Sequence, residues 1–333
     1  MPTPNALPDR ADLNALIARF RDGIEGLVPS GARLGIAVSG GPDSLALLLL
    51  AEKALPGRIA AATVDHGLRT ESADEAAMVE AFCERSGIAH RILREDGFAP
   101  VGNIQEHARK LRYRLLGGWA REAGISHVAL AHHADDVAES FLMRASRGSG
   151  VRGLAQMAEI APIPYADSPG VMIVRPLLGW RRSDLAAIVE AAGLTPAVDP
   201  SNADHRYDRS RLRALLAREP DLDPALLARS AANLTDADTA LEWLCDQAWR
   251  SRVSTNEGQA IRIDIADLPR EIRRRLAARA VAKLAPMWNR EGIDGLVDLL
   301  DDNRAATLSG VKVGPIDGGS WHFSITPPHA RHR

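Results

Sequence analysis

The chain has 333 residues, 46% of them hydrophobic, and a formal net charge of -2 at pH 7. This size predicts two domains, and the near-neutral charge excludes a global cationic field that would attract nucleic acid. The two cysteines, Cys83 and Cys245, form no CxxC pair, so they are expected to be buried free thiols rather than zinc ligands or a redox pair. Neither a secretory signal nor an apolar run of roughly 20 residues is present. We expect a soluble, cytoplasmic protein with no membrane partner.

Apolar runs alternate with amphipathic segments through the first half of the chain. A helix is expected at 10–27, strands at 33–38, 58–64, 90–93 and 127–132, and helices at 44–54, 72–86, 104–123 and 134–146. Repeated strand–helix units of this length predict the α/β class, with a parallel sheet and helices on both faces. Ligands of such sheets bind at the carboxyl ends of the strands.

The second half of the chain has a different pattern. Residues 161–170 contain three prolines and are expected to form a loop, with 171–174 a candidate edge strand. From about residue 221 long helical patterns dominate, and short β-like runs follow only after residue 304. The stretch REPDLDP interrupts the helical pattern, so we expect one domain at 1–218 and a smaller, mainly helical domain at 219–333 with a short β-like C-terminal segment.

The segment SGGPDS at 39–44 follows the first expected strand and opens a helix. Its glycines expose backbone N–H groups and its serines add hydroxyl donors, which favours an anion at the helix N-terminus. It has neither the Gly-Lys-Ser/Thr ending of a Walker loop nor the spacing of GxGxxG. The carboxylate of Asp43 would repel phosphate, so Mg²⁺ bridging Asp43 and phosphate oxygens resolves the conflict. The structural alternative is a tight turn that caps the helix.

These residues resemble the PP-loop of the ATP pyrophosphatase superfamily, whose members cleave ATP between the α- and β-phosphates to adenylate a carbonyl oxygen. Further stretches are similar to one branch, the tRNA(Ile)-lysidine synthase family. They are VDHGLR (64–69), NIQEHARKLRYRLL (103–116), HHADDVAESFLMRASRGSGVRGLAQM (132–157), RPLL (175–178) and DPSNADHRYDRSRLRALL (199–216). The resemblance covers residues 33–218, and Ser140 and Ser210 are small departures from the family pattern.

The resemblance implies roles for individual residues. ATP binding falls to Ser39, Gly40, Gly41, Pro42, Asp43, Ser44, Val64, Asp65 and His66, with Mg²⁺ on Asp43. Catalytic roles fall to Asp43, Arg109, Arg112 and His133. Lysine binding falls to His132, Asp135, Asp136 and Glu139, and tRNA binding to Arg206, Arg209, Arg211 and Arg213.

The spacing of the acidic residues supports the lysine site. Asp135 and Glu139 are four residues apart, and Asp136 and Glu139 three apart, so the three carboxylates share one face of the expected helix. The ammonium groups of lysine, together with Mg²⁺, would neutralise them. Either His132 or His133 would accept the proton that the lysine amine loses. The alternative is that the acids only cap the first turn of the helix.

The spacing of the arginines indicates contacts with phosphate groups. Arg109 and Arg112 are three residues apart, a face able to clamp phosphate or stabilise charge on an adenylated intermediate. The alternative is a solvated face with pairs such as Glu106 with Lys110. The arginines at 206–213 form a local basic patch suited to RNA, whereas a second cluster at 270–275 is at least as well explained as a solvated surface.

The resemblance implies a complete reaction. An ATP- and Mg²⁺-dependent ligase joins L-lysine to the wobble cytidine of the CAU anticodon of an isoleucine tRNA, through an adenylated cytidine, so that the tRNA reads AUA. Residues 1–218 would catalyse the reaction and residues 219–333 would bind the tRNA. A homodimer is left open by the sequence. The alternatives are a PP-loop tRNA thiolase, a small-molecule amide-forming ligase and a non-enzymatic nucleotide-binding module.

Overall fold

The computed structural model describes residues 10–66, 71–95, 104–165, 168–197, 208–256, 260–289, 291–316 and 319–326. The chain forms two compact units, Met1–Leu234 and Thr235–Arg333, which divide within the long helix α9 (Pro224–Arg252). The domain boundary placed between residues 218 and 219 from the sequence precedes this helix and stays a prediction.

The first unit is built on a six-stranded sheet. Its strands are, in spatial order, β3 (Ala89–Leu93), β2 (Ile59–Val64), β1 (Leu34–Ala37), β4 (His127–Ala129), β6 (Met172–Val174) and β5 (Ile160–Pro162). All neighbouring strands are parallel except β5 and β6. The chain moves outward from β1 through β2 and β3 and then returns to β4 on the other side of β1. The topological switch point, where ligands bind in open α/β sheets, therefore lies between β1 and β4.

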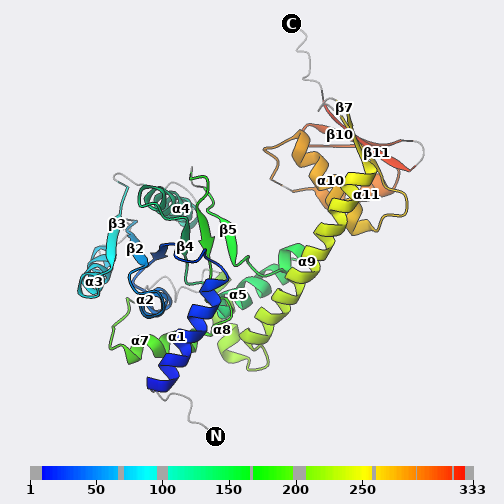
Figure 1. Cartoon of the computed structure of the whole chain (residues 1–333). Coiled ribbons are helices and arrows are strands. Elements are labelled where there is room, and N and C mark those ends of the chain that lie inside the picture. The colour runs from blue at the N-terminus through cyan, green and yellow to red at the C-terminus, as the bar shows by residue number, and fades with distance from the viewer. Residues whose placement is uncertain are drawn as a thin grey trace. The chain divides into compact units, whose positions relative to one another are not determined.

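Helices cover both faces of this sheet, as the sequence predicts (Figure 1). Helix α2 (Pro42–Ala54) packs on one face with α1 (Arg10–Glu25), α3 (Glu71–Arg85) and α7 (Arg182–Ala191), and α4 (Ile104–Glu122) packs on the other. Because both faces are buried, the strands are nearly continuous apolar runs. Gly35 of β1 is required by this packing, since a Cβ there would lie 2.9 Å from the Trp119 ring of α4.

The edge of the sheet differs from the sequence-based expectation. The candidate edge strand at 171–174 is wrong in its position, because β6 lies between β4 and β5. The edge is β5, within and beside the segment expected to be a loop. Ile173 and Val174 are buried, whereas β5 is largely exposed and contains Pro162, which is typical of an edge strand.

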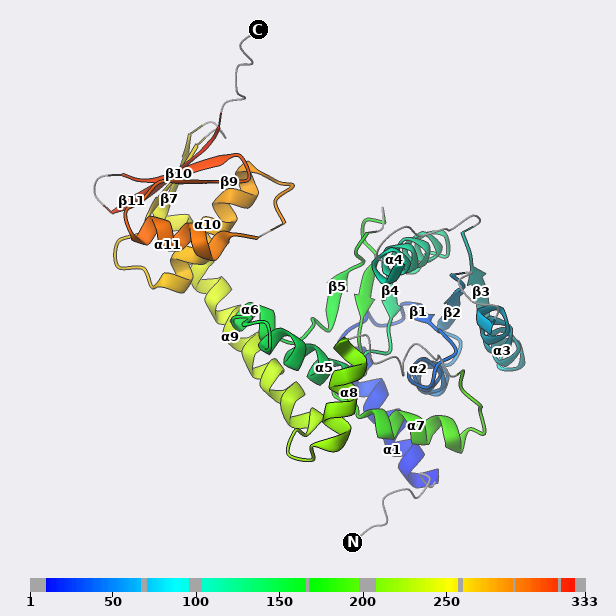
Figure 2. The same cartoon turned by 180° about the vertical axis from the view of Figure 1, so that it is seen from behind.

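The second unit contains a five-stranded antiparallel sheet, so the expectation of a mainly helical domain is wrong. The strands are, in spatial order, β7 (Val253–Asn256), β8 (Ala260–Asp264), β11 (Ser320–Ile325), β10 (Val311–Ile316) and β9 (Ala306–Leu308). Helices α10 (Arg270–Leu284) and α11 (Ile293–Asp301) pack on one face (Figure 2). The β-like runs after residue 304 are strands, as predicted, but β7 and β8 were not predicted from the sequence. Only Ile261 and Ile263 of these two strands are buried, so their period-two signal is very short.

The two cysteines agree with the sequence-based expectation. Cys83 and Cys245 are buried free thiols, and burial raises the pKa of Cys83 to about 12. Within the described ranges, no helix combines the length and the apolar character that crossing a bilayer requires.

Candidate active site

The loop Ser39–Ser44 joins the carboxyl end of β1 to the first turn of α2. Gly40 has a φ of +79°, a left-handed conformation that residues with a Cβ rarely adopt. The Ser44 hydroxyl donates to the carbonyl oxygen of Gly41 at 3.0 Å and accepts from the Ser39 N–H at 3.1 Å, which closes the loop. The first N–H groups of a helix have no partners within the helix. The loop therefore presents backbone donors in the arrangement that binds phosphate groups.

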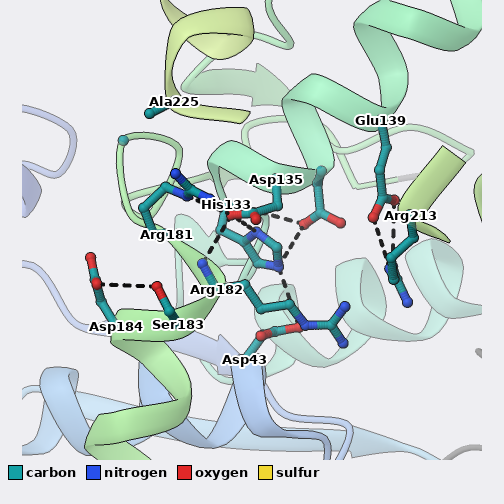
Figure 3. Close-up of polar contacts among 12 residues, drawn as sticks. Asp43, His133, Asp135, Glu139, Arg181, Arg182, Ser183, Asp184, Arg213 and Ala225 are labelled. Carbon is teal, nitrogen blue, oxygen red and sulfur yellow. Dashed lines mark hydrogen bonds and ion pairs between the residues drawn. The ribbon is translucent and has the colours of Figure 1, made fainter. Parts of the chain in front are cut away.

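His133 connects this loop to the acidic residues of helix α5 (Ala134–Ala145) (Figure 3). Its Nε2 lies 3.4 Å from Asp43 Oδ2 and 3.5 Å from Asp136 Oδ2, and its Nδ1 lies 3.6 Å from Asp135 Oδ2. The imidazole is only 2% exposed. Because β1 and β4 are adjacent and parallel, the segments that follow them meet at the same edge of the sheet. One side chain thus contacts three of the carboxylates that the sequence singled out.

The carboxylates keep His133 charged. Burial alone would lower the pKa of His133, but the carboxylates of Asp135, Asp43 and Asp136 raise it to about 10. Burial would raise the pKa of Asp135, but His133, the N–H of Arg182 and the charge of Arg181 lower it to about 2. At neutral pH the site therefore contains an imidazolium among carboxylates, and His133 has no lone pair with which to accept a proton.

The neighbouring His132 has the opposite character. Burial lowers the pKa of His132 to about 4; the charge of Asp136 opposes this shift, and the charges of Arg175, Arg209 and Arg109 add to it. At neutral pH His132 is uncharged and retains a nitrogen lone pair. Two adjacent histidines therefore differ in protonation state because of what surrounds them.

Asp43 has an oxygen suited to a cation. Its Oδ1 is buried and has no hydrogen-bond partner in the described part of the chain, a costly state for a carboxylate oxygen. Mg²⁺ typically takes one or two protein carboxylates and completes its octahedron with substrate phosphates and water. Among the described residues, no group of three or more histidine, cysteine or acidic side chains could hold a metal by itself. Asp43 fits a cation that arrives with a phosphate.

The strand next to the phosphate loop positions the second motif. Val64 ends β2, and the buried Asp65 that follows it forms an ion pair with Arg94 at 2.8 Å. Burial, and then the charge of Arg112, lowers the pKa of His66 to about 4. The exposed Arg112 side chain of α4 is therefore electrostatically linked to the β2 end of the site.

Two residues that the sequence assigned to different substrates contact each other. Glu139 of α5 accepts from Arg213 of α8 (Asp208–Arg218), with Nε to Oε1 at 2.8 Å and Nη2 to Oε2 at 3.4 Å. Glu139 is 2% exposed. The carboxylate proposed for lysine is thus neutralised in this structure by an arginine proposed for tRNA.

The remaining basic residues separate into two groups. Arg209 and Arg211 lie in α8 and are exposed, and Arg206 lies outside the described residues. The second cluster, in α10, is paired inside its own unit. Arg270 pairs with Asp298, Arg273 with Asp301, Arg274 with Glu271, and Arg275 with Asp238, Glu242 and Glu271. These ion pairs account for the second cluster without RNA.

The contribution of the start of α7 to the site was not predicted from the sequence. Arg181 lies 3.5 Å from Asp135 through Nε and 2.7 Å from Asp223 through Nη1, and the N–H of Arg182 donates to Asp135 Oδ2 at 2.9 Å. Two consecutive arginines at the start of a helix were the available signal. Its partner carboxylates are distant in the sequence, so the pairing was not predictable from spacing.

Comparison with known proteins agrees with this geometry. The sequence model of the PP-loop domain family matches residues 13–219. The chain is 48% identical over 324 residues to a tRNA(Ile)-lysidine synthase of Novosphingobium aromaticivorans, covering 96% of this chain and 97% of the relative. It is 39% identical over 317 residues to a tRNA(Ile)-lysidine synthase of Zymomonas mobilis, covering 94% of each. Among solved structures, the U34-tRNA thiolase NcsA from Methanococcus maripaludis has a TM-score of 0.57 and 18% identity, covering 68% of this chain and 81% of that chain, which concerns the fold alone.

Proposed function

The chain belongs to the tRNA(Ile)-lysidine synthase family, and from this premise we propose how its residues ligate lysine to the wobble cytidine of an isoleucine tRNA with a CAU anticodon. The ring carbonyl oxygen of the cytidine attacks the α-phosphate of ATP, and pyrophosphate leaves. The side-chain amine of lysine then attacks the ring carbon that bears this oxygen, and the oxygen leaves as part of AMP. The product, lysidine, makes the tRNA read AUA. The contact between His133 and Asp43 carries this proposal, since it unites the phosphate loop with the acidic helix.

The first step depends on the edge formed by β1 and β2. The amides of the Ser39–Ser44 loop hold the phosphates of ATP, and Val64–His66 line the nucleoside. Asp43 is the residue that would hold Mg²⁺, which would neutralise charge on the phosphate oxygens. The guanidinium group of Arg112 stabilises the charge that develops on the α-phosphate, and Arg109, one turn away on the same helix, clamps a phosphate beside it.

The second step depends on α5. Asp135, Asp136 and Glu139 attract the ammonium groups of lysine to the end of β4. His132 accepts the proton that the amine loses, because it is uncharged at neutral pH. His133 keeps its proton and holds Asp43, Asp135 and Asp136 together, so its catalytic role is electrostatic.

The RNA reaches this edge from outside. Arg206, Arg209 and Arg211 contact its phosphates, and the second unit binds the body of the tRNA. The wobble base must leave its stack to enter the site, which a single-stranded anticodon loop permits at modest cost. The proposal places the reaction in the cytoplasm, where tRNA, ATP and lysine occur together.

Product release tests the proposal. The full chain is supplied with ATP and Mg²⁺, with or without lysine, and with an isoleucine tRNA of CAU anticodon or the same tRNA with uridine at the wobble position. We expect pyrophosphate release to require the cytidine and AMP release to require lysine as well. Pyrophosphate release that is independent of the wobble base, or AMP release that is independent of lysine, would contradict the proposal.

A further inference from the structure

Three arginines act electrostatically on His132, which lies just beyond β4 at the carboxyl edge of the sheet. Arg175 directly follows β6, Arg109 lies in α4 and Arg209 lies in α8, and the charge of each acts on His132. Because β4 and β6 are paired and parallel, the residues that follow them lie at the same edge. We name Arg109, Arg175 and Arg209 the arginine trio.

Arg175 is the enclosed member of the trio. Its side chain is 9% exposed, its Nη1 donates to the carbonyl oxygen of Ala158 at 2.5 Å, and its buried Nε has no hydrogen-bond partner in the described part of the chain. Burial lowers the pKa of Arg175, and the Tyr113 side chain partly offsets this effect. A guanidinium stays protonated in proteins. Arg175 therefore holds a permanent positive charge where water is largely excluded.

Tyr113 links two members of the trio. Its buried side chain acts electrostatically on Arg175, and the guanidinium carbon of Arg109 lies 5.0 Å from the centroid of its ring. This arrangement brings two like charges to one aromatic residue.

No carboxylate forms an ion pair with any of the trio, as far as the described ranges extend. Asp136 acts on His132, but its Oδ2 accepts from the N–H of His133. The contrast with α10 is direct, since the buried Arg275 there is bound by three carboxylates. Arg109 and Arg209 are exposed to solvent, whereas Arg175 is buried, so the absence of a counter-ion is costly for Arg175 above all. A guanidinium is also a strong receptor for phosphate.

We propose that Arg175 completes a phosphate site with Arg109 and Arg209, and that its ligand is a backbone phosphate of the RNA beside the reacting cytidine. This inference rests on the proposed function and extends it to a residue with no role so far. The strand order favours RNA over ATP. The nucleoside motif follows β2, the phosphate loop follows β1, the lysine acids follow β4, and Arg175 follows β6. With strands about 4.8 Å apart, Arg175 begins about 10 Å beyond the phosphate loop, on the side away from the nucleoside.

The test is the salt dependence of RNA binding. Arg175→Gln in the full chain removes the charge, and an anticodon stem–loop RNA reports the affinity by fluorescence anisotropy over a series of KCl concentrations. We expect weaker binding and a slope of log affinity against log salt that is smaller by about 0.7, the value for one single-stranded phosphate contact. The affinity for ATP alone, measured by calorimetry, should stay unchanged.

Arg58→Gln is the matched control. Arg58 also has a buried Nε without a partner and donates to a backbone carbonyl oxygen, that of Ala32, at 3.1 Å, but it precedes β2 at the opposite edge of the sheet. Its loss should leave the salt slope unchanged. Melting curves of both variants show whether each is folded. If Arg175→Gln is unfolded, Arg175→Lys replaces it. The Arg175→Lys side chain keeps the charge but cannot donate to the Ala158 carbonyl oxygen and to a phosphate at the same time. We therefore expect weaker RNA binding with an unchanged slope of log affinity against log salt.

Each outcome is decisive. Loss of ATP affinity with an unchanged RNA slope would overturn the assignment to RNA and give the phosphate site to the nucleotide. A folded Arg175 variant that binds RNA and ATP like the wild type would overturn the phosphate site altogether. Failure of the wild type to form lysidine would refute the proposed function by itself, since the RNA-binding comparison does not depend on turnover.

Discussion

Glu139 and Arg213 form a two-point ion pair that ties α5 to α8 beside the acidic group around His133 (Figure 3). Glu139 is 2% exposed, whereas Arg213 is 32% exposed. Water can stabilise the charge of the partly exposed Arg213 but not that of the buried Glu139. The Glu139 charge therefore depends more strongly on the ion pair than the Arg213 charge does. This asymmetry leads to opposite expectations for the two partners.

Arg213→Gln should destabilise the first unit by about 3 kcal/mol, because it leaves Glu139 as a buried charge without its partner. Urea denaturation followed by far-ultraviolet circular dichroism measures the change. The control is Arg218→Gln in the same helix, whose pair with Glu219 is exposed and should contribute less than about 1 kcal/mol. Equal effects of the two substitutions would show that burial of Glu139 does not matter.

The two partners should change the lysine requirement in opposite directions. If lysine competes with Arg213 for Glu139, then Arg213→Gln lowers the KM for lysine, because the carboxylate is freed. Glu139→Gln raises it, because the carboxylate is lost. Steady-state AMP release at varied lysine concentration separates the two. If both variants raise the KM for lysine by similar factors, the ion pair has only a structural role.

Asp43→Asn should reduce pyrophosphate release by about 100-fold or more, the scale of losing one electrostatic contact in a transition state. The fold should persist, because asparagine has nearly the same shape and the carboxylates of Asp135 and Asp136 still face His133. Single-turnover release at several Mg²⁺ concentrations measures the effect. Full recovery at high Mg²⁺ would mean that the carboxylate is not needed to hold the cation.

The stability of the metal-free protein should fall as the pH rises through 10. The pKa of His133 is about 10 in the folded chain and about 6.5 in an unfolded one. A raised folded-state pKa contributes stability that is complete below 6.5 and is lost as the pH passes 10. Thermal melting with a chelator present measures this between pH 6 and 10.5.

His133→Asn is the reference for that experiment. Other groups titrate over the same range in both proteins, so the difference between the two curves isolates the imidazole. The variant should be less stable than the wild type at pH 6 and should approach it at pH 10.5. Parallel curves would mean that His133 is uncharged in the folded chain.

The sequence by itself determined the α/β class of the first unit and the elements that carry the motifs. Apolar periodicity and turn residues report local burial, so the loop at 39–44 and the helix after His133 were placed at the ends of β1 and β4, where the structure has them. Local signals were too short for β7 and β8, which are mostly polar and become strands by pairing with β11 and with each other.

Only the tertiary structure decided which charges meet. Glu139 forms an ion pair with Arg213, Asp135 forms one with Arg181, and the arginines of α10 pair with carboxylates of their own unit. It also gave the adjacent His132 and His133 opposite protonation states. The reason is physical: electrostatic energy depends on distance and burial in space, and residues far apart in the chain supply both.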